Sequence, residues 1–277
     1  MKPVAFDYEK PRDLASALKL LADGAGAAKI LAGGQSLGPM LNMRLAQPRL
    51  LVDVGAIDEL RQVTDSNDSV IFGSCVTHSA IEDGEVPDVT HGLMREVAAN
   101  IAYRAVRNRG TIGGSLCHAD PAADWVSVLV LFCAVAIIAG PAGRREVPAE
   151  RFMTGAFATD LADDEILVGL RIPKLSAGAR WGHYKFCRKP GEFAEAIGGV
   201  IDDPGRSIRR AVIGATGSTP HAIENAAFLV DGFDSGRVLA EIDGAGLGHD
   251  LYERQLRHTA LKRAAARLAG RGGDRSG

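Results

Sequence analysis

The sequence has few aromatic residues and almost no excess charge of either sign. Phe, Trp and Tyr together make up 5% of the 277 residues, which leaves little material for a surface that stacks nucleic-acid bases. The 32 basic and 34 acidic side chains give a formal net charge of -2. This balance excludes both a basic footprint for nucleic acid and a polybasic membrane signal.

Cysteine is also scarce. The four cysteines are widely separated and form no CxxC pair: Cys75, Cys117, Cys133 and Cys187. Their spacing excludes a zinc or iron–sulfur site built by this chain alone, and a disulfide framework is not expected in a chain of this size. We therefore predict four reduced, mostly buried thiols and no metal site.

Long hydrophobic runs are missing as well. The most apolar segment, 125–140, reads WVSVLVLFCAVAIIAG and lies between Asp124 and Pro141. It is shorter than the ~20 apolar residues that a membrane-spanning helix needs, so we expect a buried helix that runs into a buried strand. The start of the sequence, MKPVAFDY, lacks the apolar core of a signal peptide, which predicts a cytoplasmic protein without membrane insertion.

Several motifs of familiar chemistry do not occur. The sequence contains no G-x-G-x-x-G after a strand, no P-loop, no H-E-x-x-H and no G-x-S-x-G. An ordinary NAD dehydrogenase, a kinase, a zinc hydrolase and a serine esterase are therefore disfavoured. Since no residue stands out as a general acid, a general base or a nucleophile, we predict no catalytic residue in this chain.

Two glycine segments of the same chemistry are the most informative feature that is present. The first is Ala32-Gly33-Gly34-Gln35-Ser36, and the second is Thr111-Ile112-Gly113-Gly114-Ser115. Glycine adopts positive φ at little cost, and consecutive N–H groups in such a turn point into one concavity that suits an anion. Either segment alone fits an ordinary structural corner. Together they predict two clamps on an extended anionic cofactor such as a dinucleotide, with Ser36 and Ser115 as further donors.

The N-terminal half predicts alternating helices and strands. A helix over 13–23, a strand over 29–32, a short helix over 37–42 and a strand over 50–54 form a small β-α-β-like unit. The first glycine segment then lies at the carboxyl end of a strand, where ligands of open α/β sheets bind. Further on, we expect strands over 70–73, 134–139, 144–147 and 166–172, and helices over 88–101 and from Asp120, with Asp120 as N-cap.

The C-terminal part follows a different pattern. After a linker at 176–179, three antiparallel strands are expected over 181–188, 194–201 and 208–216. Helices are expected over 222–230, 235–243 and 251–268. The glycine- and arginine-rich end of the sequence predicts a disordered tail.

The segment after the second glycine pair, LCHADPAAD, carries several polar residues. His118 and Asp120 allow a metal site or an acid–base pair, but a helix cap at Asp120 and a polar loop residue at His118 are the better interpretation. Asp124 lies in an otherwise apolar helix, and a buried carboxylate needs partners. A ribose or ribityl hydroxyl is one candidate partner, and Arg107 or Arg109 is another.

Over nearly its whole length the chain resembles the FAD-binding medium subunits of the molybdenum hydroxylases, which include bacterial carbon monoxide dehydrogenase and xanthine dehydrogenase. The resemblance is carried by the blocks FDYEKPRDLASALKLL, ILAGGQSL, LVDV, IAYRAVRNRGTIGGSLCHADPAAD, LVGLRIP and YKFCRKPGEFAEA. The AGGQS and RGTIGGS…DPAAD blocks are highly specific in this order and spacing. Cys117-His118 and the segment after Lys185 depart from the pattern, which bears on the surroundings of the flavin ring and on the electron acceptor.

The resemblance implies an α+β fold with a two-subdomain FAD-binding domain of the para-cresol methylhydroxylase type. That domain would cover 1–176, with subdomains over about 1–56 and 57–176. A smaller C-terminal α+β domain of the carbon monoxide dehydrogenase flavoprotein type, with a three-stranded antiparallel sheet and helices, would cover 177–270. A disordered tail would follow over 271–277.

The resemblance also implies the residues that contact FAD. Both glycine segments would wrap the pyrophosphate from opposite sides: Lys29, Ile30, Leu31, Ala32, Gly33, Gly34, Gln35 and Ser36, and then Thr111, Ile112, Gly113, Gly114 and Ser115. Asp124 matches the acidic FAD ligand of the family, and Ile101 matches an apolar neighbour of the cofactor. Leu167 matches a residue near the flavin ring, and Lys185 matches a basic FAD contact.

The implied function is electron transfer. Electrons would pass from the [2Fe-2S] clusters of a small partner subunit through FAD to an external acceptor, and a large subunit with the molybdenum cofactor would hydroxylate the substrate. The implied assembly is a dimer of heterotrimers. Two alternatives remain open: a stand-alone FAD-dependent oxidase or dehydrogenase, for which His118 or Tyr103 would be tried as base, and a binding module whose glycine segments are only structural.

Overall fold

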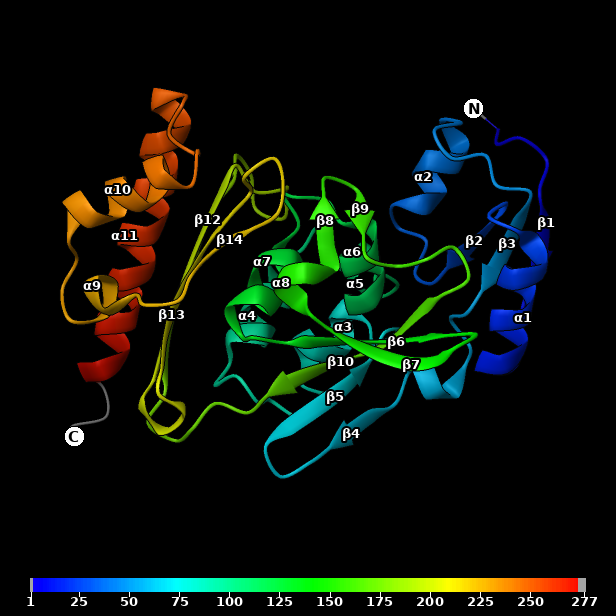
Figure 1. Ribbon diagram of the computed structural model, residues 1–277, viewed down its shortest axis with the longest axis horizontal. Helices are drawn as coiled ribbons and strands as arrows, with labels where there is room; N and C mark the ends of the chain where they lie inside the picture. The colour runs from blue at the N-terminus through cyan, green and yellow to red at the C-terminus, as the bar shows by residue number, and fades with distance from the viewer. Residues whose placement is uncertain (1, 274–277) are drawn as a thin grey trace.

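The protein, described here by a computed structural model over residues 2–273, has three parts that lie side by side along its long axis (Figure 1). The N-terminal part lies at one end, an antiparallel sheet with its helices forms the middle, and the C-terminal domain lies at the other end. β1 (Asp7–Glu9) and the end of α11 (Leu251–Gly273) therefore lie far apart.

The N-terminal part is a three-stranded parallel sheet in the order β1-β3-β2. Its elements are β1 (Asp7–Glu9), α1 (Leu14–Gly24), β2 (Ala28–Leu31), α2 (Leu37–Asn42), β3 (Leu50–Asp53) and the 3-10 helix η1 (Asp58–Leu60). Asp13 caps α1 by accepting a hydrogen bond from the N–H of Ser16 at 2.7 Å. The β-α-β unit predicted from the sequence is confirmed, since β2 and β3 are parallel neighbours joined through α2.

The middle part is a five-stranded antiparallel sheet in the order β4-β5-β10-β6-β7. The strands are β4 (Val63–Asp65), β5 (Ser69–Gly73), β6 (Val135–Gly140), β7 (Gly143–Pro148) and β10 (Ile166–Pro173). The helices are α3 (His78–Asp83), α4 (Leu93–Ala99), α5 (Arg104–Arg107), α6 (Ile112–His118), α7 (Asp124–Leu131) and α8 (Ala149–Phe152). A small hairpin pairs β8 (Met153–Gly155) with β9 (Ala158–Thr159).

Two of the predicted helices in this part begin later than expected. The helix predicted over 88–101 begins at Leu93, because the Asp88 carboxylate accepts from the N–H of Thr90 and Gly92 takes a φ of 89°. The helix predicted from Asp120 begins at Asp124, with Ala123 as N-cap. The prediction of Asp120 as N-cap is wrong, since its carboxylate closes a local turn by accepting from the N–H of Ala122.

The C-terminal domain has a four-stranded antiparallel sheet in the order β11-β12-β13-β14. Its elements are β11 (Arg180–Phe186), β12 (Ala196–Asp203), η2 (Pro204–Arg206), β13 (Ile208–Gly214), β14 (His221–Ile223), α9 (Ala227–Val230), α10 (Ser235–Gly244) and α11 (Leu251–Gly273). The prediction of three strands is wrong, because the start of the expected helix over 222–230 pairs with β13 as a fourth strand. Helix α11 extends into the predicted tail as far as Gly273, and 274–277 lie outside the described residues.

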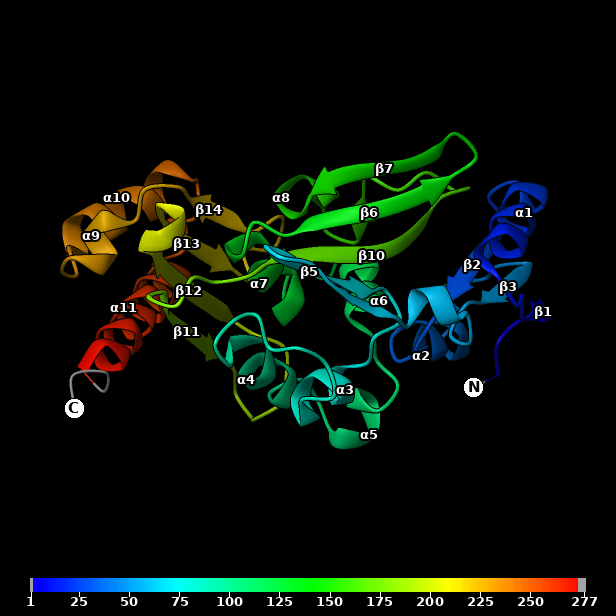
Figure 2. The same ribbon diagram turned by 90° about the horizontal axis from the view of Figure 1, so that it is seen from below.

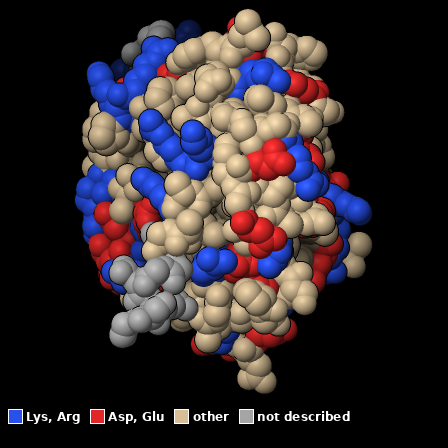
Figure 3. Space-filling view, turned by 90° about the vertical axis from the view of Figure 1, so that its left-hand side faces the viewer, with Lys and Arg blue, Asp and Glu red and all other residues tan. Residues whose placement is uncertain are grey.

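Close packing joins α11 and α7 to this sheet. A Cβ on Gly198 would lie 2.6 Å from the Ala260 carbonyl carbon, so only glycine lets α11 approach the strands this closely. On the opposite face, a Cβ on Gly199 would lie 2.7 Å from Leu131 of α7. The face of the domain seen in Figure 3 carries basic and acidic side chains intermixed, without a field of one sign.

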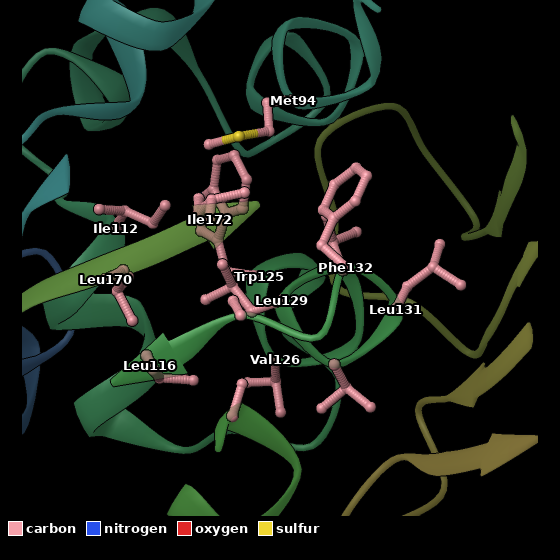
Figure 4. Packing of buried hydrophobic residues seen from close by; sticks show 14 of the residues in the cluster. Met94, Ile112, Leu116, Trp125, Val126, Leu129, Leu131, Phe132, Leu170 and Ile172 are labelled. Atoms are coloured by element: carbon pink, nitrogen blue, oxygen red, sulfur yellow. The ribbon is translucent and has the colours of Figure 1, made fainter. Parts of the chain in front are cut away.

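The largest hydrophobic core centres on α7, whose eight residues are all buried. Figure 4 shows Trp125, Leu129 and Phe132 packed in this core with Met94 and Ile172. The same cluster includes Trp181, Ile201 and Val212 of the C-terminal domain, so the middle part and that domain share one core. The predicted buried helix and strand over 125–140 are confirmed as α7 and β6. Within residues 2–273, no helix is both long and apolar enough to cross a membrane.

Candidate functional site

The first glycine segment connects β2 to α2 and leaves a row of main-chain donors open. Gly34 has a φ of 72°, which turns the chain sharply before the helix. Within residues 2–273, the N–H groups of Gly33, Gly34, Gln35 and Ser36 donate to no acceptor, although the Gln35 side chain donates to the Gly33 carbonyl at 3.0 Å. This segment therefore has the free donors that an anion requires.

The second glycine segment differs from its prediction. Thr111 is the N-cap of α6, and Gly113 and Gly114 lie inside the first helical turn rather than in a glycine turn. The N–H groups of Ile112 and Gly113 donate to the carbonyls of Val76 and Ser74, both at 3.0 Å. The N–H of Gly114 donates to the Thr111 hydroxyl, also at 3.0 Å. The expected concavity of free N–H donors is thus wrong for this segment, because the protein itself uses them.

The glycines of the second segment instead allow close packing. A Cβ on Gly113 would lie 2.5 Å from Cβ of Ser74, and one on Gly114 would lie 2.7 Å from the Thr111 hydroxyl oxygen. A larger residue at Gly113 would therefore push α6 away from the end of β5.

The fold places the two segments against each other. A Cβ on Gly33 would overlap the Arg109 carbonyl and lie 2.7 Å from its carbon, so the first segment touches the chain just before the second. A Cβ on Gly114 would lie 3.9 Å from Cβ of Ala32. Two segments that are distant in the sequence therefore form one continuous surface, as expected for two parts of one site.

Asp124 and Lys185 form a buried ion pair between the middle part and the C-terminal domain. The Lys185 ammonium lies 2.8 Å from Oδ2 of Asp124, and the two side chains are only 8% and 6% exposed. Oδ1 of Asp124 is buried and has no hydrogen-bond partner within the described residues. Burial raises the pKa of the Asp124 carboxyl, and the charge of Lys185 opposes that rise. Of the candidate partners named from the sequence, Arg107 and Arg109 are wrong, because Lys185 is the cation that pairs with Asp124.

The remaining predicted residues are distributed over several elements. Ile101 follows α4 and packs against the largest hydrophobic core, which includes Leu167 and Ile112. Leu167 is 3% exposed and lies beside a bulge in β10. Lys29 is exposed on β2, while His118 ends α6 and packs against Phe157, with ring centroids 5.2 Å apart and ring planes inclined by 55°.

One residue that supports the site was not predicted. His78 is 5% exposed, and its ring accepts a hydrogen bond from the Trp125 indole at 3.1 Å. The main-chain N–H of His78 donates to the carbonyl of Gly110, and a Cβ on that glycine would lie 2.8 Å from the His78 ring. Burial lowers the pKa of His78 to about 4, so the ring is neutral near pH 7. It links the residue before Thr111 to the residue after Asp124, a contact with no local sequence signal.

The four cysteines form no disulfide. All four are free, but only Cys75 is buried and the other three are half-buried, so the prediction of mostly buried thiols is wrong. Within residues 2–273, no group of three or more His, Cys, Asp and Glu side chains is placed to hold a metal ion.

Sequence comparisons identify the family of the chain. Residues 4–175 match the model of the FAD binding domain in molybdopterin dehydrogenase. The chain is 37% identical over 231 residues to the caffeine dehydrogenase subunit beta of Pseudomonas sp. (strain CBB1), covering 81% of this chain and 78% of that protein. It is 32% identical over 285 residues to the carbon monoxide dehydrogenase medium chain of Afipia carboxidovorans, covering 98% and 99%.

Solved structures show the same fold. Carbon monoxide dehydrogenase from Hydrogenophaga pseudoflava, in a form lacking the Mo-pyranopterin moiety, matches with a TM-score of 0.89 and 32% identity over 98% of this chain and 99% of that chain. Quinoline 2-oxidoreductase from Pseudomonas putida 86 matches with a TM-score of 0.83 and 30% identity over 98% and 99%. The predicted α+β flavoprotein fold is thereby confirmed. The chain belongs to the FAD-binding medium subunits of the molybdenum hydroxylases, and it is an oxidoreductase subunit with FAD as its cofactor.

Proposed function

We propose that this chain is the electron-transfer subunit of a heteromeric molybdenum hydroxylase or dehydrogenase. In this role, electrons from the [2Fe-2S] clusters of a small partner subunit reach an external acceptor through FAD, and a large subunit with the molybdenum cofactor hydroxylates the substrate. The relatives support the proposal, because they are named as subunits or medium chains of dehydrogenases. We also propose a dimer of heterotrimers in the cytoplasm.

The observation that carries the proposal is the orphaned Oδ1 of Asp124, taken together with the open N–H groups of the first glycine segment. A buried carboxylate oxygen without a partner is costly, and a hydroxyl donor would satisfy it. FAD carries ribityl and ribose hydroxyls, and its pyrophosphate suits the open N–H groups of Gly33 to Ser36. The residues present therefore fit this cofactor, with Asp124 and the first glycine segment as its main polar contacts.

The second glycine segment has a different role in this proposal. Since the N–H groups of Ile112, Gly113 and Gly114 are already used, this segment contributes its surface and the Ser115 hydroxyl rather than a row of amide donors. Ile101, Leu167 and Lys185 complete the proposed site. We propose that the domain over 1–176 binds FAD and that the domain from 177 onward contributes Lys185 to the site.

When bound, FAD supplies reversible one- and two-electron chemistry. The chain's own residues bind and orient it. The charge of Lys185 favours the ionised form of the buried Asp124 carboxyl, and that form accepts hydrogen bonds more strongly than the neutral form. No residue of the chain is assigned as general acid or base. Tyr103, a candidate base of the stand-alone oxidase, is 78% exposed rather than enclosed in a pocket.

The direct test is the visible spectrum of the chain purified gently with its partners. We expect the absorption bands of oxidised flavin and their loss on adding the substrate of the complex. An Asp124→Asn variant should retain less FAD than an Asp120→Asn variant, because among residues 2–273 the Asp120 carboxylate accepts a hydrogen bond only from the N–H of Ala122. A complex without flavin would contradict the proposal. Bleaching of the flavin by a small alcohol in the isolated chain would favour the stand-alone oxidase instead.

A further inference from the structure

A corner over Asn100, Ile101 and Ala102 lies where the middle part meets the C-terminal domain. Ala102 has a φ of 44°, in the left-handed region that residues other than glycine rarely adopt. Such a conformation persists only where surrounding contacts hold it. The contacts that hold this corner come from both sides of the junction.

Arg107 provides two of these contacts. Its Nη1 donates to the carbonyls of Ile101 and Ala102, each at 3.0 Å. The other side of the guanidinium pairs with Glu82, through Nε to Oε2 at 2.7 Å and Nη2 to Oε1 at 2.9 Å. The side chain of Arg107 is 12% exposed and that of Glu82 is 18% exposed. Only the planar fork of arginine can bind a carboxylate along one edge and main-chain carbonyls at its end.

The C-terminal domain provides the other contacts. The N–H of Ala102 donates to the Gly191 carbonyl at 3.0 Å, and a Cβ on Gly191 would lie 2.7 Å from the Ala102 oxygen. The Lys185 ammonium lies 3.4 Å from the Asn100 carbonyl and also pairs with Asp124 at 2.8 Å. Lys185 therefore couples the corner to Asp124. Within the described residues, Lys185 is the only side chain that pairs with the Asp124 carboxylate.

We propose that Arg107 is a positioning residue for the flavin site. Held by Glu82, it fixes the left-handed corner at Ala102, and through that corner it sets the position of Lys185 against Asp124. This inference rests on the proposed function, because it assumes that FAD contacts Asp124. The Arg107 guanidinium is engaged by Glu82 and by the Ile101 and Ala102 carbonyls, so it would act on the cofactor through the corner.

The test is an Arg107→Lys substitution in the full chain, which keeps the charge but loses the fork. We expect FAD to bind about tenfold more weakly, the effect of losing one charge-assisted hydrogen bond. We also expect the visible circular dichroism of the bound flavin to change at saturating FAD, which a loss of stability alone would not cause.

Arg104→Lys is the matched control. Arg104 lies on the same short helix, is 50% exposed, pairs with Asp83 at 2.7 Å and approaches the same Glu82 at 3.3 Å. In the described part of the chain its guanidinium donates to no main-chain carbonyl. FAD affinity and flavin spectrum should be those of the wild type. If Arg107→Lys behaves like Arg104→Lys, the proposal is wrong.

A second variant tests the corner directly. Adding Ala102→Gly to Arg107→Lys should recover part of the FAD affinity, because glycine adopts the left-handed conformation without support. No recovery would show that Arg107 does not act through the corner and would overturn the proposal. A wild-type chain that binds no FAD at all would instead contradict the proposed function, so the two failures are distinguishable.

Discussion

A Lys185→Met substitution tests the buried ion pair most directly. Methionine keeps most of the side-chain length but removes the ammonium that lies 2.8 Å from the Asp124 carboxylate. Because the two side chains are only 8% and 6% exposed, Asp124 would become an uncompensated buried charge. Removing one partner of a buried pair costs about 3–5 kcal/mol of unfolding free energy. Asp124 is the first residue of α7, where the helix dipole stabilises a negative charge by about 0.3–1 kcal/mol and so offsets part of this cost.

The net loss expected from these two effects is about 3 kcal/mol. For a chain of this size, that loss lowers the melting temperature by roughly 6–12 °C. The loss should also depend on pH. Burial already raises the pKa of Asp124, and without Lys185 the pKa rises further. The folded state then binds a proton that the unfolded state has released, so stability falls as pH rises above the unfolded pKa of about 3.9 and through the folded pKa.

The assay is thermal unfolding of the FAD-free chain at pH 5 and at pH 8, so that loss of cofactor does not contribute. We expect a larger drop in melting temperature at pH 8. Lys174→Met is the control, since its ion pair with Asp65 is 33% and 56% exposed and should contribute less than about 1 kcal/mol. A drop no larger than that of the control, or an equal drop at both pH values, would refute the reasoning.

Two further predictions follow from close contacts around the glycine segments. Gly33→Ala would push a Cβ into the Arg109 carbonyl and should destabilise the chain by about 1–3 kcal/mol in thermal melts, whereas Gly38→Ala, with nothing within 4 Å, should not. The lowered pKa of His78, about 4, means that the unfolded chain binds more protons, so stability should fall as pH drops from 6.5 to 4. His78→Asn, which keeps an acceptor for Trp125, should reduce this slope in melts across that range; an unchanged slope would contradict the assignment.

Much of the fold could be predicted from the sequence. The periodicity of 13–23 predicted α1, and the residues over 29–54 predicted β2, α2 and β3. The apolar segment after Asp124 predicted a buried helix and strand. These elements were accessible because caps, turns and hydrophobic periodicity act over a few neighbouring residues.

Other elements could not be read locally. The strand β14 exists because β13 offers it an edge, although 221–223 resemble the start of a helix. The second glycine segment looked like a turn, but Thr111 caps it as a helix and Ser74 requires its small residues. In both cases a tertiary contact outweighed the local preference.

The sequence by itself therefore determined the order of elements and the two glycine segments, together with the resemblance to a flavoprotein family. Only the tertiary structure decided that Gly33 lies against the chain before Thr111, that Lys185 pairs with Asp124, and that Arg107 supports the corner at Ala102. The physical reason is that a buried charge or a left-handed residue is stabilised by whichever groups packing brings to it, and packing joins residues that no local pattern connects.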